Sequence, residues 1–232
     1  MCNSLSYDPL NFKKTTDLIR IELIKWGENY IKNYPWRNTS DPYKITVAEI
    51  MLTRTKADQV KKLYIKFINK FPDFRSIVEA GPDKIKSELF SLGLSRRSDQ
   101  LYRLAQEIID KYNCVVPGSL DKLLKLPGMG NYTASAIHCS INNMPAPVLD
   151  TNTVRLTGRI FGLKVTDSSR RSRKFKDIMY ELINCAEPRK FFYSILDFAK
   201  YICLEKNPKC NVCPLNIICC YYRERKYEKR IN

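Results

Sequence analysis

The chain has 232 residues, of which 44% are hydrophobic, so it is long enough to bury a core and too apolar to be disordered throughout. Its 40 Lys and Arg residues outnumber its 24 Asp and Glu residues, which gives a formal net charge of +16 at pH 7. A surplus of this size favours a polyanionic partner over an ordinary solvated surface, because neutralising phosphates releases condensed counterions. A membrane surface is a weaker third choice.

The N-terminal residues give no sign of export. Residues 1–9 lack a basic segment followed by an apolar run, and no stretch approaches the roughly 18 apolar residues of a membrane span. We therefore expect a cytoplasmic protein that does not enter a membrane. In that compartment the nine cysteines indicate metal ligands or buried thiols rather than disulfide bonds.

Apolar residues recur at helical spacing along nearly the whole chain. The pattern is clearest over residues 60–68, 101–112, 175–183 and 192–202. Proline or capping side chains precede helical runs at residues 41–42, 71–73, 81–83 and 117–119. No segment alternates with period two over a strand length. The sequence predicts an all-α fold.

Two polar segments are expected to lie outside the helices. Residues 165–174 (VTDSSRRSRK) are basic and predict an exposed connection between helices. The charged tail from Tyr221 is expected to fray, or to follow bound DNA.

Residues 124–136 (LKLPGMGNYTASA) predict a tight turn between two helices. Pro127 fixes the entry to the turn, and Gly128 and Gly130 permit positive φ or close backbone approach. The next helix begins at about Tyr132, so its free N–H groups are available to a phosphate. An ordinary helical hairpin is the alternative.

Asp150 follows an apolar pair at 148–149 and precedes a helical run. From the residues alone, this position is typical of a helix N-cap.

Four cysteines near the C-terminus have the spacing C-x6-C-x2-C-x5-C: Cys203, Cys210, Cys213 and Cys219. Four thiolates bind either zinc or an iron–sulfur cluster. Generic zinc sites usually pair two short C-x2-C elements, whereas this segment has one. Four buried thiols are a third possibility, and Cys220 is easily confused with a ligand because it adjoins Cys219.

The cysteine spacing is similar to the [4Fe–4S] loop of endonuclease III and MutY-type adenine glycosylases. The turn at 126–130 resembles the helix-hairpin-helix of the same DNA glycosylase superfamily, and the resemblance runs from about Tyr34 to Cys219. It implies a structural [4Fe–4S] cluster on the loop 203–219, which presents basic residues to DNA. It also implies two helical lobes with a DNA-binding cleft between them. We expect a six-helix lobe at 34–145 and a discontinuous lobe at 1–33 plus 146–232.

The resemblance assigns catalytic roles to two residues already singled out. In such enzymes an Asp at the place of Asp150 is the essential carboxylate, which stabilises the positive sugar formed when the glycosidic bond breaks. Endonuclease III-like enzymes have a Schiff-base Lys at the place of Tyr132, which a phenol cannot replace. Tyrosine there resembles archaeal-type mismatch glycosylases that remove thymine or uracil opposite guanine.

Residues 34–37, 41–43 and 48–55 resemble the opening of MutY-type and mismatch-thymine enzymes. The resemblance makes Glu49 a second carboxylate at the pocket, which protonates the departing base or orients water; an exposed helical Glu is the alternative. Arg54 would fill the gap left by the extruded base, and Leu94, in the segment 92–94, would probe the opposite strand. Further expected DNA contacts lie in the hairpin: Leu126, Gly128, Met129, Gly130 and Thr133.

Taken together, these features predict a monofunctional DNA glycosylase that excises thymine or uracil mispaired with guanine. Its partner would be duplex DNA with a mismatched base, with no small-molecule substrate, and the protein would be a monomer associated with a prokaryotic nucleoid. A MutY-type adenine glycosylase is the main alternative, although residues 220–232 leave no room for a domain that recognises 8-oxoguanine. A bifunctional lyase and a non-catalytic DNA-binding module are the others.

Overall fold

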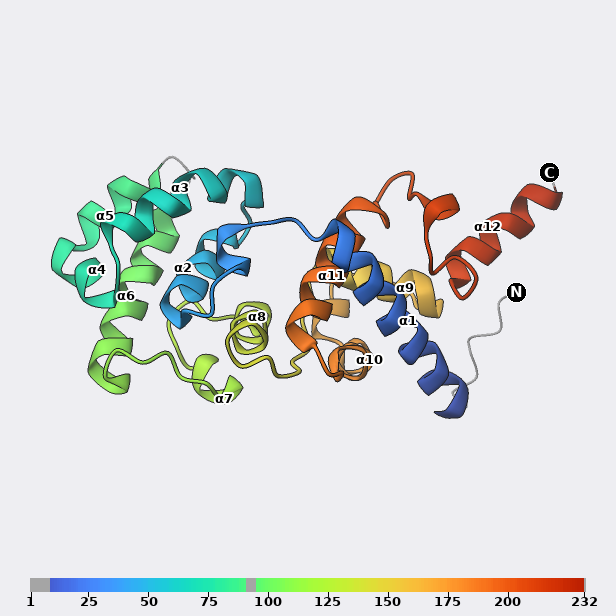
Figure 1. The fold of residues 1–232 in the computed structure, drawn as a ribbon, viewed down its shortest axis with the longest axis horizontal. Helices are drawn as coiled ribbons and strands as arrows, with labels where there is room; N and C mark the ends of the chain where they lie inside the picture. The colour runs from blue at the N-terminus through green and yellow to red at the C-terminus, as the bar shows by residue number, and fades with distance from the viewer. Residues whose placement is uncertain (1–8, 91–94, 232) are drawn as a thin grey trace. The chain divides into compact units, whose positions relative to one another are not determined.

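The structure, a computed structural model, describes residues 9–90 and 95–231 (Figure 1). Within these two ranges the regular structure is helical and contains no strand, which confirms the all-α prediction. None of the described helices combines the length and apolar character that a membrane span requires. The chain divides into a continuous unit, Asn33–Asn143, and a discontinuous unit, Met1–Lys32 with Met144–Asn232. These bounds lie close to those of the two expected lobes.

The continuous unit contains seven α-helices among its described residues, one more than expected, because the four-residue α7 forms before the hairpin. The helices are α2 (Pro42–Leu52), α3 (Ala57–Lys70), α4 (Phe74–Ala80), α5 (Pro82–Leu89), α6 (Ser95–Tyr112), α7 (Leu120–Leu123) and α8 (Asn131–Asn142), preceded by the 3-10 turn η1 (Pro35–Arg37).

Local sequence signals account for where several of these helices begin. Asp41 caps α2 by accepting hydrogen bonds from the backbone N–H groups of Tyr43 and Lys44, with Pro42 as the first helical residue. Asp73 and Ser76 form a reciprocal capping box at the start of α4.

One apolar core holds the continuous unit together. Side chains from α2, α3 and α6 meet in it, including the fully buried Met51, Tyr64 and Leu104. In Figure 1, α4 and α5 lie along α6, and the three helices pack against one another. This core fixes α2 and α8, which pack together and carry candidate site residues.

The discontinuous unit joins the N-terminal helix to the C-terminal third of the chain. Its elements are α1 (Pro9–Tyr30), α9 (Thr151–Phe161), η3 (Ser169–Arg171), α10 (Arg173–Ile183), α11 (Pro188–Tyr201), η4 (Cys210–Val212) and α12 (Cys220–Ile231). The main contact is between α1 and α11, which approach closely at Gly27. A Cβ at Gly27 would lie 2.1 Å from Oγ of Ser194, so no larger residue fits there without displacement.

One of the two expectations about polar segments needs correction. The tail from Tyr221 is helical, as part of α12, because its first turn is anchored: the Arg159 guanidinium lies 4.6 Å from the centre of the Tyr221 ring, and Cys220 is buried. The segment 165–174 is largely exposed and connects two helices, as expected. It contains η3, whose Ser169 is buried, and the connection ends where α10 begins at Arg173.

Candidate functional site

The hairpin before α8 alternates between buried and exposed positions. Leu126 and Met129 are buried in the core of the continuous unit, whereas Gly128 and Gly130 are exposed. Leu126 and Met129 therefore offer DNA only their main chains, and Thr133 is likewise buried, with 6% of its surface exposed. The exposed part of the turn is backbone, which suits a phosphate contact.

The two hairpin glycines are needed for different reasons. Gly128 has a φ of +77°, and a Cβ there would lie 3.2 Å from Cβ of Gln100 on α6. Gly130 has an ordinary φ of −86°, and a Cβ there would have no neighbour within 4 Å. Backbone conformation therefore explains why residue 128 is glycine, but not why residue 130 is. The second leaves open space beside the N-terminus of α8, whose first N–H groups have no side-chain cap.

Glu49 and Tyr132 lie on the packed helices α2 and α8. Tyr132 is the second residue of α8, directly after the hairpin, and is half-buried. Glu49 is buried, with 6% of its surface exposed, so it is not the solvated helical residue that was the alternative.

Burial changes the chemistry of Glu49. Removal from water raises the pKa of its carboxyl group to about 7, and the positive charge of Arg37 acts in the opposite direction. A carboxyl with a pKa near 7 can both give and accept a proton at neutral pH. Glu49 therefore has the property required of a general acid or base.

Arg54 lies in the loop between α2 and α3 and has a strained backbone. Its φ is +57°, in the left-handed region, and its side chain is exposed. That conformation costs a residue with a Cβ roughly 1–2 kcal/mol. Arg97 of α6 offsets this cost by donating to Oγ1 of Thr55 at 2.9 Å and to the carbonyl of Met51 at 3.4 Å, because a hydrogen bond from a charged group contributes about 1.5–3 kcal/mol. Leu94, the second expected DNA-probing residue, lies outside the described residues.

Asp150 belongs to the discontinuous unit, where it is the N-cap of α9. Its Oδ1 accepts a hydrogen bond from the N–H of Thr153 at 2.7 Å, and its own N–H donates to Oγ1 of Thr153 at 2.9 Å. Asn152 Nδ2 donates to Oδ2 at 2.9 Å. The half-buried carboxylate is thus held at both oxygens, so the capping role and a fixed anion are compatible.

A chain of hydrogen bonds connects Asp150 to the cysteine segment. Arg155 donates through Nη1 to Oδ1 of Asn152 at 3.0 Å, and Asn152 in turn holds Asp150. The same guanidinium donates to the carbonyl oxygens of Cys203 at 3.0 Å and Ala199 at 2.7 Å. Arg155 therefore ties the start of the cysteine segment to the support of Asp150.

All four predicted ligand cysteines line one cavity of the discontinuous unit, beside Arg159 and Leu215: Cys203, Cys210, Cys213 and Cys219. Across the described chain, no three His, Cys, Asp or Glu side chains gather closely enough to hold a single metal ion. A shared cavity lined by four cysteines is compatible with both four-cysteine centres that the spacing left open, zinc and an iron–sulfur cluster.

The cysteine cavity does not stabilise thiolates by itself. Burial raises the pKa of the Cys213 thiol to about 12 and raises those of Cys210 and Cys219 as well, and neighbouring cysteines raise them further. A metal centre would supply the positive charge that replaces these protons. The donor set therefore fits a four-cysteine cluster.

Arg159 is a further support of the cysteine segment. It donates to the carbonyl oxygens of Leu204 at 2.6 Å and Glu205 at 2.8 Å, and it approaches Sγ of Cys203 at 3.4 Å. Cys220 is not part of the cavity lining and packs instead against Gly162 at the end of α9.

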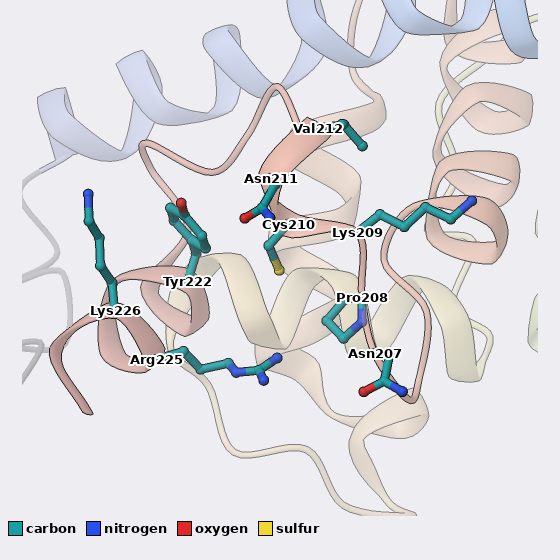
Figure 2. Close-up of a pocket in the computed structure, with 9 residues that line it drawn as sticks. All are labelled: Asn207, Pro208, Lys209, Cys210, Asn211, Val212, Tyr222, Arg225 and Lys226. Carbon is teal, nitrogen blue, oxygen red and sulfur yellow. The ribbon is translucent and has the colours of Figure 1, made fainter. Parts of the chain in front are cut away.

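A second, basic cavity adjoins the cysteine segment. Figure 2 shows the guanidinium of Arg225 and the sulfur of Cys210 pointing into the same space. Lys209 on the loop and Lys226 on α12 add positive charge to the lining. The cysteine loop and α12 thus present cations side by side at the surface.

Comparison with known proteins identifies the family. Residues 47–179, more than half of the chain, match the HhH-GPD superfamily of base excision DNA repair proteins. The chain belongs to this superfamily. The matched range contains the second half of α2 with Glu49, the hairpin, Asp150 and the supporting Asn152 and Arg155.

Similarity to individual superfamily members extends over nearly the whole chain. The chain is 34% identical to a thymine/uracil-DNA glycosylase of Pyrobaculum aerophilum, over 97% of this chain and 99% of that protein. The structure of a thermostable thymine-DNA glycosylase superposes with a TM-score of 0.85 at 32% identity, covering 91% of this chain and 98% of that one. An adenine DNA glycosylase of Buchnera aphidicola subsp. Baizongia pistaciae is 30% identical over 91% of this chain, which spans only 60% of that protein.

Several residues of the candidate site were not anticipated from the sequence: Arg97, Asn152, Arg155 and Arg159. Arg155 and Arg159 lie four residues apart among buried apolar positions of α9. This pattern predicts that their aliphatic side-chain carbons are buried and that each guanidinium forms hydrogen bonds. That signal was available in the sequence. The hydrogen bond between Arg97 and Thr55, in the loop of Arg54, joins residues 42 positions apart, and no local sequence pattern predicts it.

Proposed function

We propose that this protein is a monofunctional DNA glycosylase that hydrolyses the glycosidic bond of thymine or uracil mispaired with guanine. The observation that carries the proposal is Tyr132, at the start of α8, in a chain similar over 97% of its length to a thymine/uracil-DNA glycosylase. Membership of a base excision repair superfamily supports the reaction class. The net charge of +16 supports a duplex DNA partner.

Asp150 and Glu49 divide the chemistry between them. As the N-glycosidic bond breaks, its electron pair leaves with the base and the deoxyribose becomes an oxocarbenium-like cation. The carboxylate of Asp150, held by Asn152 and Thr153, stabilises that cation and accepts a proton from the attacking water. Glu49 in its acid form gives a proton to the departing base, for which a pKa near 7 is suited. The products are a free base and an abasic site.

Tyr132 limits the reaction to hydrolysis. An amine at this position could attack the sugar carbon and form a Schiff base, which then promotes strand cleavage. A phenol cannot form an imine. The abasic strand should therefore stay intact after base release.

DNA binding uses other parts of the chain. The exposed hairpin backbone at Gly128 and Gly130 is proposed to bind a phosphate of the DNA. Arg54 occupies the gap left by the extruded base, and extrusion is easiest at a mispair because the least pairing energy is lost there. Leu94 is proposed to probe the opposite strand. One chain carries every residue with an assigned role, so the proposal needs no second subunit.

The four cysteines are proposed to hold a [4Fe–4S] cluster, supported by their shared cavity and by their spacing. When bound, the cluster supplies structural cross-linking of the loop and no bond-making step. The loop itself presents Lys209 beside Arg225 of α12, which suits contact with a phosphate backbone. A nucleoid-associated location in a prokaryotic cell is part of this proposal, because the proposed substrate is duplex DNA.

Asp150→Asn tests the proposed chemistry. The amide keeps the shape of the side chain but not its charge, so the single-turnover rate on duplexes with G·T or G·U should fall at least about 100-fold, the scale for one electrostatic group. Asp167→Asn is the matched control, because Asp167 is exposed in a connection of the same unit. If both variants release base at the wild-type rate, Asp150 is not the catalytic carboxylate.

A further inference from the structure

The loop of Arg54 is held in an unfavourable conformation. Arg54 combines a left-handed backbone, at φ +57°, with an exposed side chain. Such a conformation persists only where surrounding contacts determine it, and in functional loops it often serves to aim a side chain. Within the loop, the N–H of Thr55 donates to the carbonyl of Leu52 at 3.1 Å and closes a turn whose third residue is Arg54. Contacts from outside the loop add to this local hydrogen bond.

Arg97, in the first turn of α6, makes these contacts. Its Nη1 donates to Oγ1 of Thr55 at 2.9 Å and to the carbonyl of Met51 at 3.4 Å, on either side of Arg54 along the chain. The half-buried guanidinium thus joins the last turn of α2 to the residue after Arg54. These bonds restrict the backbone on both sides of the strained residue.

The charge of Arg97 acts on Arg54 as well. Burial lowers the pKa of Arg97, and the nearby positive charge of Arg54 lowers it further, so the two guanidinium groups repel each other. Within the described part of the chain Arg97 forms no ion pair that would neutralise this charge. Repulsion therefore disfavours any conformation in which Arg54 folds back onto α6.

The same part of α6 supports the hairpin. Gln100, one helical turn after Arg97, packs so closely against Gly128 that a Cβ there would lie 3.2 Å from Cβ of Gln100. Two loops proposed to meet DNA are thus tied to adjacent turns of one helix. Rigid spacing between a phosphate contact and a side chain that enters the base stack favours a single binding register.

We propose that Arg97 is a positioning residue that holds Arg54 extended toward the space left by the flipped base. It acts through the backbone on either side of Arg54 and through charge repulsion, and it does not itself enter the DNA. This assignment rests on the proposed glycosylase function. It predicts that the effect of Arg97 depends on the presence of Arg54.

A double-mutant cycle on the full-length, cluster-loaded protein tests this dependence. The variants are Arg97→Gln, Arg54→Ala and the double variant, with Arg103→Gln as control, because Arg103 is an exposed arginine of the same helix. The probes are a duplex with a tetrahydrofuran abasic analogue opposite guanine and the matched duplex. The quantity compared is the ratio of the two dissociation constants, measured beside the melting temperature.

Arg97→Gln should reduce this discrimination about 10-fold in the wild-type background and less than twofold in the Arg54→Ala background. Thr55→Val, which removes the acceptor while leaving both arginines, should reproduce part of the loss, and Arg97→Lys should recover part of it because the charge is kept. Equal effects in the two backgrounds, or a wild-type ratio for Arg97→Gln, would overturn the assignment. If the Arg97→Gln variant is insoluble, Thr55→Val replaces it in the same double-mutant cycle with Arg54→Ala.

The same experiment separates this assignment from the proposed function. An enzyme that excises some other base would still bind the abasic analogue, and the coupling between Arg54 and Arg97 would still appear. A protein that releases neither thymine nor uracil yet shows the coupling would refute the substrate and keep the positioning role.

Discussion

Glu49 is a carboxylic acid enclosed by the helices of the continuous unit, and its environment makes a prediction about stability. Its pKa is raised from 4.5 to about 7 by burial, so the folded protein retains a proton that the unfolded chain has lost over this range. The stabilisation is complete below pH 4.5 and is lost as the pH rises through about 7. The full loss amounts to roughly 3 kcal/mol, at about 1.4 kcal/mol per pKa unit.

Glu49→Gln should therefore flatten the pH dependence of stability. The amide cannot ionise, so the variant should melt several degrees above the wild type at pH 8 and at or below it at pH 4.5. Glu79→Gln, at an exposed position of α4, should show no such pH-dependent difference. A difference in melting temperature that does not change with pH would mean that the pKa of Glu49 is the same in the folded and the unfolded protein.

At the scale of single residues, the sequence was most informative where chemistry and local structure coincide. Asp150 is both an N-cap and the candidate carboxylate, so its local signal located it. The residues that hold Asp150 in place were harder to find, because their partners are distant in the sequence. Arg155 donates to Ala199 on α11, 44 positions away, and to Cys203, 48 positions away. The same holds for Arg97 and Thr55.

At the scale of elements, the helix-hairpin-helix turn offers a matched pair of substitutions. Gly130→Ala should leave the melting temperature unchanged, since its φ is ordinary and a Cβ meets nothing within 4 Å. It should nevertheless weaken duplex binding if the turn backbone approaches a phosphate. Gly128→Ala should lower stability by about 1–2 kcal/mol, because alanine is strained at φ +77° and crowds Gln100.

Duplex dissociation constants and urea denaturation of both variants measure this difference. Wild-type binding by Gly130→Ala would show that the space beside α8 is not a DNA contact, whatever happens at Gly128.

The cysteine segment, residues 203–219, makes a separate prediction. Cys210→Ser should reduce the iron content and the visible absorbance of the purified protein and lower its melting temperature, because the loop loses one of four anchors. Cys185→Ser is the control, since Cys185 lies outside the cavity. Full iron content in Cys210→Ser would exclude Cys210 from the ligand set.

The helices themselves were largely predictable, and the exceptions have physical causes. The apolar spacing located α3, α6, α10 and α11 because each has one buried face. The helical tail α12 was missed because few apolar residues mark it. Its stability derives from Tyr221 against Arg159 and from the buried Cys220, which are tertiary contacts.

At the scale of the whole molecule, the charge and the family agree. A net charge of +16 predicted a polyanionic partner, and the HhH-GPD superfamily consists of DNA repair proteins. Neither composition nor fold selects the base that is removed, because the pocket contacts that decide this depend on side chains from separate segments. The identity of the excised base therefore needs a direct measurement.

That measurement is single-turnover incubation with labelled duplexes containing G·T, G·U, G·A or 8-oxoguanine·A, each analysed before and after hot alkali. We expect product from G·T and G·U only, and only after alkali, because Asp150 and water would release the base and Tyr132 cannot cleave the strand. Product from the adenine duplexes alone would make the protein an adenine glycosylase. Strand breaks without alkali would contradict the monofunctional mechanism.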